Sequence, residues 1–472
     1  MKHLARLLVV FALTAIAATS TATAANRMWM GFHDDPVFRW NDGRMDELDK
    51  AVFEHATIIR TLVTWANVAS TKPTNASDPF DPAYKLDDVD ELVRNAQQRG
   101  IEVLITVWGT PKWANGGQGP NVAPTDMNDF RQFTQALAAR YSGRYAGYPF
   151  VRFYGVWNES NLGQFLSPQF DASGNIVSAA TYAKLAAAAY TGIKKGNPSA
   201  LVAIGETSSH GRDKPLTGNS DTVSPGMFAQ LVAQANPRLK FDAWAHHPYP
   251  YPVFQKPSQK VKWPNVSLSS LPRFETSLDS WFHRKNIPVW ITEYGHETKP
   301  GEPLGVTEAQ QAAYLPQAIA LARKDPRVQM FIWFVFRDSV GSTWQSGLYR
   351  LNGTAKPALA KWRQVVPSLD ARNPYITLKG GTTNPAINLV VREICSNNAP
   401  GSSVGMTYRV YAGKKFVKVG QTSVPLGKDC TVTARPAFTF GKGKTYTVVF
   451  NMNTYNGVIV QRTATVATIT TT

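Results

Sequence analysis

Eight apolar, strand-like runs recur along the first three quarters of the chain at intervals of about 40 residues. They cover residues 28–32, 56–65, 101–109, 151–159, 201–206, 241–249, 288–295 and 328–336. The runs are continuously apolar rather than alternating, which is typical of parallel strands buried on both faces. Because parallel strands need long crossover connections, this spacing predicts repeated β-α units.

Helical patterns lie between these runs. The clearest ones cover residues 86–100, 127–143, 179–198 and 307–326. Gly100 and Gly143 are helix stop signals, and Pro316 interrupts the last pattern. We therefore expect an α/β protein with a (β/α)8 TIM barrel over residues 25–370. An open doubly wound sheet is the alternative, but it would show fewer strands, and a glycine-rich phosphate loop is missing from the sequence.

The pattern changes to short alternating strands in the last hundred residues. Strands are expected over residues 387–395, 406–412, 416–422, 430–440, 446–452 and 458–469. Turn residues separate them at a spacing that is typical of a β-sandwich, so residues 371–472 are predicted to form a second, all-β domain. The chain has two cysteines, Cys395 and Cys430, both in this domain, and we expect them to form one disulfide.

The first 24 residues have the pattern of a secretory signal peptide. Lys2 and Arg6 precede an apolar run over residues 7–18, and Ala22-Thr23-Ala24 is an A-x-A cleavage signal. The run is too short to span a bilayer, although an N-terminal membrane anchor is the alternative interpretation. We expect an exported protein, either extracellular or held in the periplasm or cell envelope, without a membrane span.

The chain is strongly basic. Its formal charge is +17, and +15 remains once Lys2 and Arg6 leave with the signal peptide. Such a charge favours acidic polysaccharide, anionic cell-wall polymer or nucleic acid as neighbours. The basic residues are scattered and form no nucleic-acid motif, so nucleic acid is not expected. An anionic cell-wall polymer is kept as a partner, and we expect a monomer.

In a barrel of this kind, the chemistry sits where the strands end. The notable residues there are His33, Arg60, Trp65, Trp108, Asn158, Glu159, Glu206, His246, His247, Tyr249, Glu293 and Trp333. Glu159 and Glu293 follow the fourth and seventh runs behind similar leads, "VWNE" and "WITE". Two carboxyl groups that converge on one pocket, with pKa values kept apart by their surroundings, are what cleavage of a glycosidic bond requires.

The order of these residues resembles the clan A retaining glycoside hydrolases. The pattern is Asn-Glu after the fourth strand, His-x-Tyr after the sixth, Glu after the seventh and Trp on the eighth. The stretches "YGVWNESN" (154–161) and "ITEYG" (291–295) are most similar to families 39 and 5, including bacterial exopolysaccharide endoglycosidases. The resemblance covers residues 28 to 366. Ser160 replaces a usual proline, and Trp108 stands where family 5 members carry histidine.

The resemblance implies a polysaccharide or oligosaccharide substrate, double displacement and no cofactor. It implies that Glu159 is the acid/base and Glu293 the nucleophile. Asn158 would hold the sugar 2-hydroxyl, and Trp333 would form the platform under the substrate. The remaining expected contacts around the substrate and the nucleophile are His33, Arg60, Trp65, Trp108, His247 and Tyr249.

Other functions have weaker support in the sequence. Glu206 is expected to be a structural partner of an arginine. His246 and His247 lack an H-E-x-x-H spacing or an aspartate cluster, so no metal site is expected. An esterase would need a G-x-S-x-G elbow between a strand and a helix, and the predicted barrel, residues 25–370, has none. A carbohydrate- or cell-wall-binding protein with a catalytically weak barrel is the alternative, and loss of Glu159 or Glu293 would have been its sign.

Overall fold

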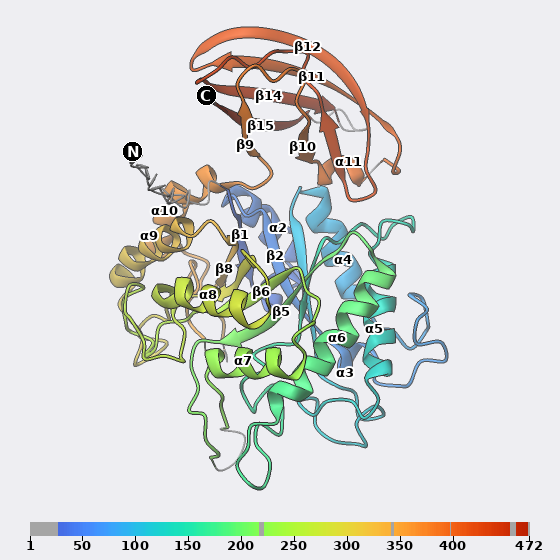
Figure 1. Ribbon diagram of the computed structural model, residues 1–472, viewed down its shortest axis with the longest axis vertical. Coiled ribbons are helices and arrows are strands. Elements are labelled where there is room, and N and C mark those ends of the chain that lie inside the picture. The colour runs from blue at the N-terminus through green and yellow to red at the C-terminus, as the bar shows by residue number, and fades with distance from the viewer. Residues whose placement is uncertain (1–26, 217–220, 341–343, 397, 454–458, 471–472) are drawn as a thin grey trace, which may run out of the picture.

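The computed structural model describes residues 27–216, 221–340, 344–396, 398–453 and 459–470. The predicted signal peptide, residues 1–24, lies outside this part of the chain. Figure 1 shows two units, a barrel wrapped by helices and a smaller β domain that sits against one end of it.

Eight parallel strands close the barrel in sequence order, β1 next to β2 and so on until β8 pairs with β1. They are β1 (Trp29–His33), β2 (Ile58–Thr64), β3 (Glu102–Trp108), β4 (Phe153–Val156), β5 (Leu201–Ser208), β6 (Ala243–His247), β7 (Val289–Tyr294) and β8 (Val328–Phe334). Each strand lies within, or within two residues of, one of the eight apolar runs, so the predicted (β/α)8 barrel is confirmed.

Helices surround the barrel. They are α1 (Asp35–Phe38), α2 (Arg44–Phe53), α3 (Trp65–Val68), α4 (Asp87–Gln98), α5 (Met127–Arg140), α6 (Ser178–Gly196), α7 (Pro225–Ala235), α8 (Leu271–Trp281), α9 (Glu308–Lys324) and α10 (Pro357–Val365). Local sequence signals determine where several of these helices begin or end. Gly100 takes a φ of 72° just after α4, a left-handed conformation that suits glycine. Thr307 and Gln310 form a capping box at the start of α9, which contains Pro316.

Side chains of the strands alternate between two buried layers. In β8, Met330 and Ile332 face the barrel axis, while Phe331 and Trp333 pack in the layer between strands and helices. Both layers are apolar, which is why the sequence runs are continuous. The next position that faces the axis in β8 is Phe334, at the end of the strand where the chemistry is expected.

The C-terminal domain consists of two sheets around one core. The larger sheet has the order β12-β11-β14-β15-β9 and the smaller one pairs β10 with β13. The strands are β9 (Tyr375–Lys379), β10 (Ile387–Val390), β11 (Ser403–Ala412), β12 (Lys415–Pro425), β13 (Thr431–Ala434), β14 (Thr445–Asn453) and β15 (Ile459–Ile469). The predicted all-β fold is confirmed, as is the Cys395–Cys430 disulfide, whose Cα atoms lie 5.7 Å apart.

Three details of this domain differ from the sequence prediction, and the first is that the strand expected over residues 430–440 ends at Ala434. The five-residue strand β9, at the edge of the larger sheet, is too short and too exposed to carry a clear sequence signal and was not predicted. The strand expected over residues 387–395 ends at Val390, because α11 (Arg392–Cys395) follows it. This short helix carries the buried Arg392 side chain to the barrel, where it bonds to Glu102 at 2.6 Å.

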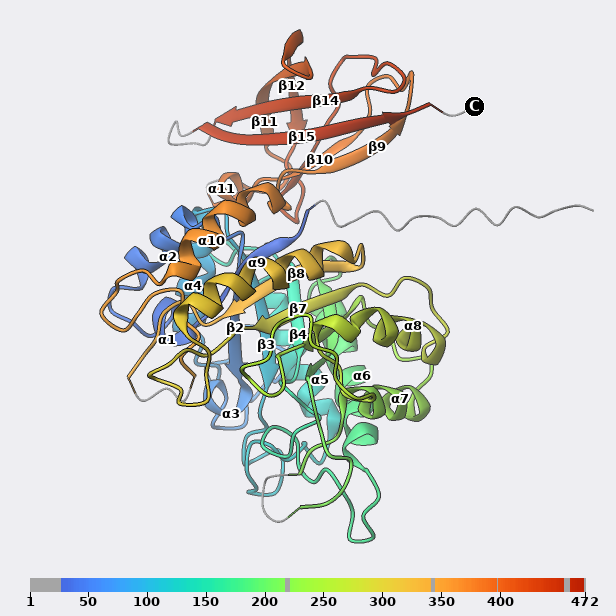
Figure 2. The same cartoon turned by 90° about the vertical axis from the view of Figure 1, so that its left-hand side faces the viewer.

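The β domain covers the end of the barrel where the strands begin. Arg392 and Glu102, the first residue of β3, form an ion pair in which both side chains are 1% exposed. Arg152, just before β4, donates to the carbonyl of Asp429. The opposite end of the barrel therefore stays clear of this domain, as Figure 2 shows. Among the described residues, no helix has the length and apolarity that crossing a membrane requires.

Candidate active site

Glu159 is aimed into the barrel mouth by the chain that follows β4. The amide of Trp157 donates to Val107 in β3 at 2.7 Å, and the amide of Glu159 donates to the carbonyl of Glu206 in β5 at 2.8 Å. Trp157 and Glu159 both have positive φ angles, 69° and 37°, which residues other than glycine rarely adopt. Hydrogen bonds to both neighbouring strands therefore hold a strained turn, as is common at functional sites.

Glu293, near the end of β7, is held by donors on both carboxylate oxygens. Oε1 accepts from the guanidinium of Arg60 at 2.5 Å, and Oε2 accepts from the hydroxyl of Tyr249 at 2.9 Å. Nδ1 of His33 lies 3.3 Å from Oε1. Burial alone would raise the pKa of Glu293, but the His247 and Arg60 cations hold this pKa well below its usual range. Glu293 is therefore ionised at neutral pH.

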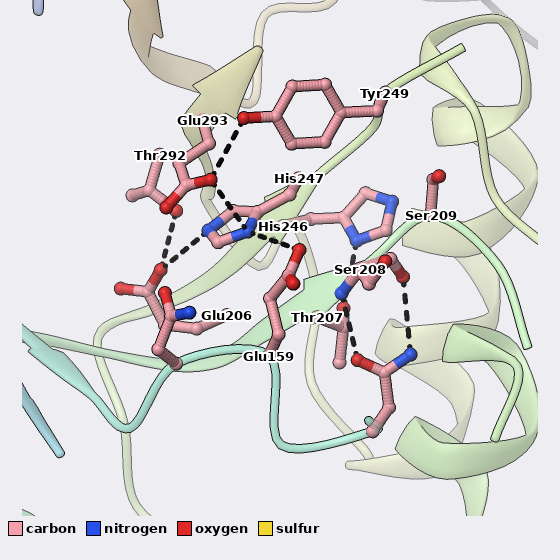
Figure 3. A network of polar contacts seen from close by, with 12 residues as sticks. Glu159, Glu206, Thr207, Ser208, Ser209, His246, His247, Tyr249, Thr292 and Glu293 are labelled. Carbon is pink, nitrogen blue, oxygen red and sulfur yellow. Dashed lines mark hydrogen bonds and ion pairs between the residues drawn. The ribbon is translucent and has the colours of Figure 1, made fainter. Parts of the chain in front are cut away.

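His247 lies between three carboxyl groups, as Figure 3 shows. Its Nδ1 is 3.0 Å from Oε1 of Glu159 and 3.6 Å from Oε2 of Glu293, and its Nε2 is 3.1 Å from Oε2 of Glu206. Burial alone would lower the pKa of His247, but the three surrounding carboxyl groups, Glu293 first, raise it to about 9. Both ring nitrogens donate, and the side chain is an imidazolium.

Glu206 completes the buried network beneath the mouth. It pairs with Arg60 at 3.2 Å and accepts from the hydroxyl of Thr292 at 2.7 Å. The prediction that Glu206 is a structural partner of an arginine is confirmed. The second NH2 group of Arg60 also donates to Oδ1 of Asn158 at 2.9 Å, and its Nε donates to Thr106 at 3.0 Å. Arg60 thus fixes the positions of several site residues at once.

The charges around the mouth are shared unevenly among the three carboxyl groups. Arg60 pairs with both Glu206 and Glu293, and His33 lies 3.3 Å from Glu293 as well. Glu159 pairs with His247, which it shares with the other two acids. Its burial, together with the charge of Glu293, raises the pKa of Glu159 against the opposing effect of His247. The surroundings therefore push the pKa values of the two carboxyl groups apart, that of Glu159 upward and that of Glu293 downward.

The two glutamates lie close together. One oxygen of Glu159 and one of Glu293 lie within 4.8 Å of each other and of a nitrogen of His247. Inverting glycosidases keep their carboxyl groups roughly 6.5–9.5 Å apart to admit a water, whereas retaining enzymes keep them about 5–5.5 Å apart. The observed separation leaves no room for that water and suits direct attack by a carboxylate.

Among the residues that the structure describes, the same three side chains, Glu159, His247 and Glu293, are the group that could supply ligand atoms to a metal ion. In the structure these atoms bond to one another and to Arg60. His246 cannot join them, because its ring donates to the carbonyl of Val266 at 3.0 Å on the other side of β6. Burial lowers the pKa of His246 to about 3, so this histidine is neutral and structural.

Two of the predicted aromatic contacts need correction. Trp333 is completely buried, and its indole N–H donates to the carbonyl of Ser346 in the layer outside the barrel. Trp65 is also completely buried and stacks on Phe133 at 5.3 Å. Trp333 lies in the layer between strands and helices, and Trp65, the first residue of α3, packs against α5, so neither ring can lie under a substrate.

Other aromatic rings occupy the mouth instead. Phe334, next to Trp333, faces the axis with its ring 5.0 Å from His33. Trp108 is half-buried at the end of β3, edge-on to Phe165 at 5.4 Å, and stays a candidate for sugar contact. The sequence interpretation missed Phe334 and Thr106, although strand alternation from Trp108 along β3 could have indicated Thr106.

Comparison with known proteins agrees with this geometry. The family model described as cellulase, glycosyl hydrolase family 5, matches residues 24–336. The search of curated proteins returned no match.

Among solved structures, the chain is similar to a family 39 glycoside hydrolase from the gut symbiont Bacteroides cellulosilyticus WH2. The identity is 20%, the TM-score is 0.51, and the match covers 87% of this chain and 81% of that one. It is also similar to a GH5_18 protein from Bifidobacterium longum, determined in complex with Manβ1-4GlcNAc, at 15% identity and a TM-score of 0.50 over 79% and 86% of the two chains. At these identities the two structures support the fold alone.

Proposed function

Since the chain belongs to the cellulase family, glycosyl hydrolase family 5, we propose that it cleaves an oligosaccharide or polysaccharide with Glu159 as acid/base and Glu293 as nucleophile. It is a retaining glycoside hydrolase of clan A. The observation that carries the assignment of roles is the close pair of glutamates with oppositely shifted pKa values.

In the first step, an oxygen of Glu293 bonds to the anomeric carbon while the bond from that carbon to the leaving oxygen breaks. Glu159 gives its proton to the leaving oxygen, so the leaving group departs as an alcohol. Arg60 and Tyr249 bind the Glu293 oxygens and hold them for attack. The product of this step is a glycosyl ester on Glu293 and an ionised Glu159.

In the second step, Glu159 accepts a proton from water, and the water oxygen attacks the anomeric carbon and breaks the ester. Loss of the negative charge on Glu293 in the ester removes one of the effects that raised the pKa of Glu159. The imidazolium of His247, 3.0 Å away, stabilises the carboxylate of Glu159 at this stage. Glu159 is therefore an acid when Glu293 is free and a base when Glu293 is esterified.

Substrate contacts follow from the same geometry. Oδ1 of Asn158 accepts from Arg60, which orients the amide NH2 of Asn158 to donate to the sugar 2-hydroxyl. Trp108 and Phe334 supply apolar ring faces beside the two glutamates.

The signal-peptide pattern of residues 1–24 supports export, and the Cys395–Cys430 disulfide suits an oxidising compartment. The proposed substrate is accordingly a saccharide outside the cytoplasm.

A panel of neutral and acidic polysaccharides, with sizing of the products, tests this function. The wild-type enzyme should release sugars from at least one of them, and Glu293→Gln should release none while keeping its melting temperature within a few degrees. Glu91→Gln, a surface substitution on α4, is the matched control and should keep full activity. Failure of the wild type on the whole panel, or product release by Glu293→Gln, would contradict the proposal.

A further inference from the structure

A cavity of about 480 Å³ lies between the barrel and the β domain, at the opposite end of the barrel from the candidate active site. Its walls come from α4, from residues 143–150 between α5 and β4, and from the turn that follows α11 together with the turn before β13. We call it the interdomain cavity. Its volume is in the range of known ligand sites.

Positive charges line this cavity without negative ones. Arg94, Arg144 and Lys428 contribute to its walls, whereas none of the described residues that line it is Asp or Glu. Arg94 and Lys428 make no side-chain hydrogen bond or ion pair within the described ranges of the chain. Arg144 donates to the hydroxyl of Ser142 and the carbonyl of Gly196, both of which are neutral. The three charges therefore remain available to an anion.

Two acidic side chains on the β-domain side of the cavity, Asp429 and Glu393, are already committed to other partners. Asp429 lies 3.6 Å from Arg152, and Glu393 lies 2.7 Å from Arg462. These pairs neutralise the acids that border the cavity on the side of the β domain. A carboxylate on a ligand would consequently meet Arg94, Arg144 and Lys428 without competition from these two acids.

Aromatic rings form another part of the wall. Tyr145 and Tyr148 line the cavity, and Tyr145 is 38% exposed. Phe80 contacts both rings edge-on at 4.9 Å, and the guanidinium of Arg140 lies 4.6 Å from the centre of the Tyr148 ring. Rings that are held in place and partly exposed are suited to packing against the apolar faces of sugars.

The cavity is held open by contacts between the two domains. The Cys395–Cys430 disulfide forms part of its wall, and the amide of Gln97 in α4 donates to Sγ of Cys430 at 3.4 Å. The buried Arg392–Glu102 ion pair fixes the β domain on the barrel nearby. A ligand would therefore enter a site whose backbone walls are preformed, and only flexible side chains such as Arg94 and Lys428 would become ordered on binding.

We propose that the interdomain cavity binds an oligosaccharide that carries carboxylates, such as a chain of uronic acids. Cations would bind the carboxylates, and the tyrosine rings would pack against the sugar faces. This site is separate from the catalytic glutamates and would hold an acidic polysaccharide to the enzyme whichever bond the barrel cleaves.

Titration calorimetry on the full chain tests this site, with trigalacturonate, neutral cellotriose and inorganic phosphate as probes. Trigalacturonate should bind, more weakly as salt is raised. The double substitution Arg94→Ala with Lys428→Ala should weaken binding by about tenfold or more, because charge-assisted hydrogen bonds are lost. Lys415→Ala with Lys418→Ala, two exposed lysines on β12, is the matched control and should change nothing.

Two further variants distinguish binding in the interdomain cavity from binding in the catalytic mouth. Tyr145→Ala should weaken trigalacturonate binding, and Glu293→Gln should leave it unchanged. The proposal is overturned if trigalacturonate does not bind or if the control pair weakens it equally. It is also overturned if cellotriose or phosphate binds as tightly, or if Glu293→Gln abolishes binding, which would place the sugar in the catalytic mouth.

Discussion

Nδ1 of His247 lies 3.0 Å from Oε1 of Glu159 at the mouth of the barrel, where the His247 side chain is fully buried and that of Glu159 is 15% exposed. The other nitrogen of the same ring faces Glu206. One imidazolium thus connects the proposed acid/base to the ion-pair network beneath it. This arrangement lets Glu159 release and regain a proton while the surrounding charges stay fixed.

Replacement of Glu159 by glutamine should slow hydrolysis of natural saccharides by about 10²–10⁴-fold, because the leaving oxygen no longer receives a proton. Substrates with a dinitrophenolate leaving group need no proton and should still form the glycosyl ester. Azide should then restore turnover and give a glycosyl azide. Rates measured with both substrate types check this, and equal losses on both, without an azide product, would contradict the role of Glu159.

The stability of the protein should depend on pH through His247. Its pKa in the folded state, about 9, is raised above the ordinary value of 6.5. The stabilisation is therefore fully present below about pH 6.5 and is lost as the pH rises through about 9. It amounts to roughly 3 kcal/mol in the free energy of unfolding. Urea denaturation at several pH values between 6 and 9.5 measures this loss.

The contribution of His247 is isolated by comparing variants, because burial also raises the pKa of Glu275 to about 9. His247→Gln should give a flatter decline of stability over this pH range than the wild type. His246→Gln is the matched control, since His246 stays neutral in the folded state, and it should keep the wild-type slope. Equal slopes in the wild type and His247→Gln would show that His247 is not an imidazolium.

Trp108, which lies at the mouth, and Trp333, which is buried between strand and helix, should respond differently to substitution. Trp108→Ala should raise KM and leave the melting temperature nearly unchanged, because this ring lines the mouth. Trp333→Ala should cost about 3–5 kcal/mol of unfolding free energy, because it empties a buried site between strand and helix. Thermal melts and saturation kinetics distinguish the two. A stable Trp333→Ala protein with an increased KM would reverse the assignment.

All eight barrel strands could be located from the sequence, because parallel strands that are buried on both faces carry apolar residues at most positions. The same property conceals which of two adjacent residues faces the axis. Trp333 and Phe334 are both aromatic, and only the inward positions of Met330 and Ile332 show that Phe334 reaches the mouth. This ambiguity does not arise for the polar residues Arg60, Glu159, His247 and Glu293. A charged group that is buried in a barrel is costly unless a partner of opposite charge lies beside it, so these side chains are expected to lie together.

Trp65 illustrates a different limit. Strand β2 ends at Thr64, and α3 begins at Trp65, so a change of backbone direction turns this ring toward α5. Strand ends cannot be read from sequence to a single residue. The buried link from Arg392 to Glu102 was equally invisible, because the packing of two domains leaves no periodic pattern in either.

A fluorinated glycoside tests most directly whether Glu293 forms the covalent bond. The enzyme would be incubated with the dinitrophenyl 2-deoxy-2-fluoro glycoside of the sugar that the polysaccharide panel identifies, and then analysed by mass spectrometry. The intact mass should rise by one fluoro-sugar, and peptide mapping should place this sugar on Glu293. A sugar bound to Glu159 or Glu206, or an unlabelled enzyme that releases a product of inverted configuration, would contradict the assignment of Glu293 as nucleophile.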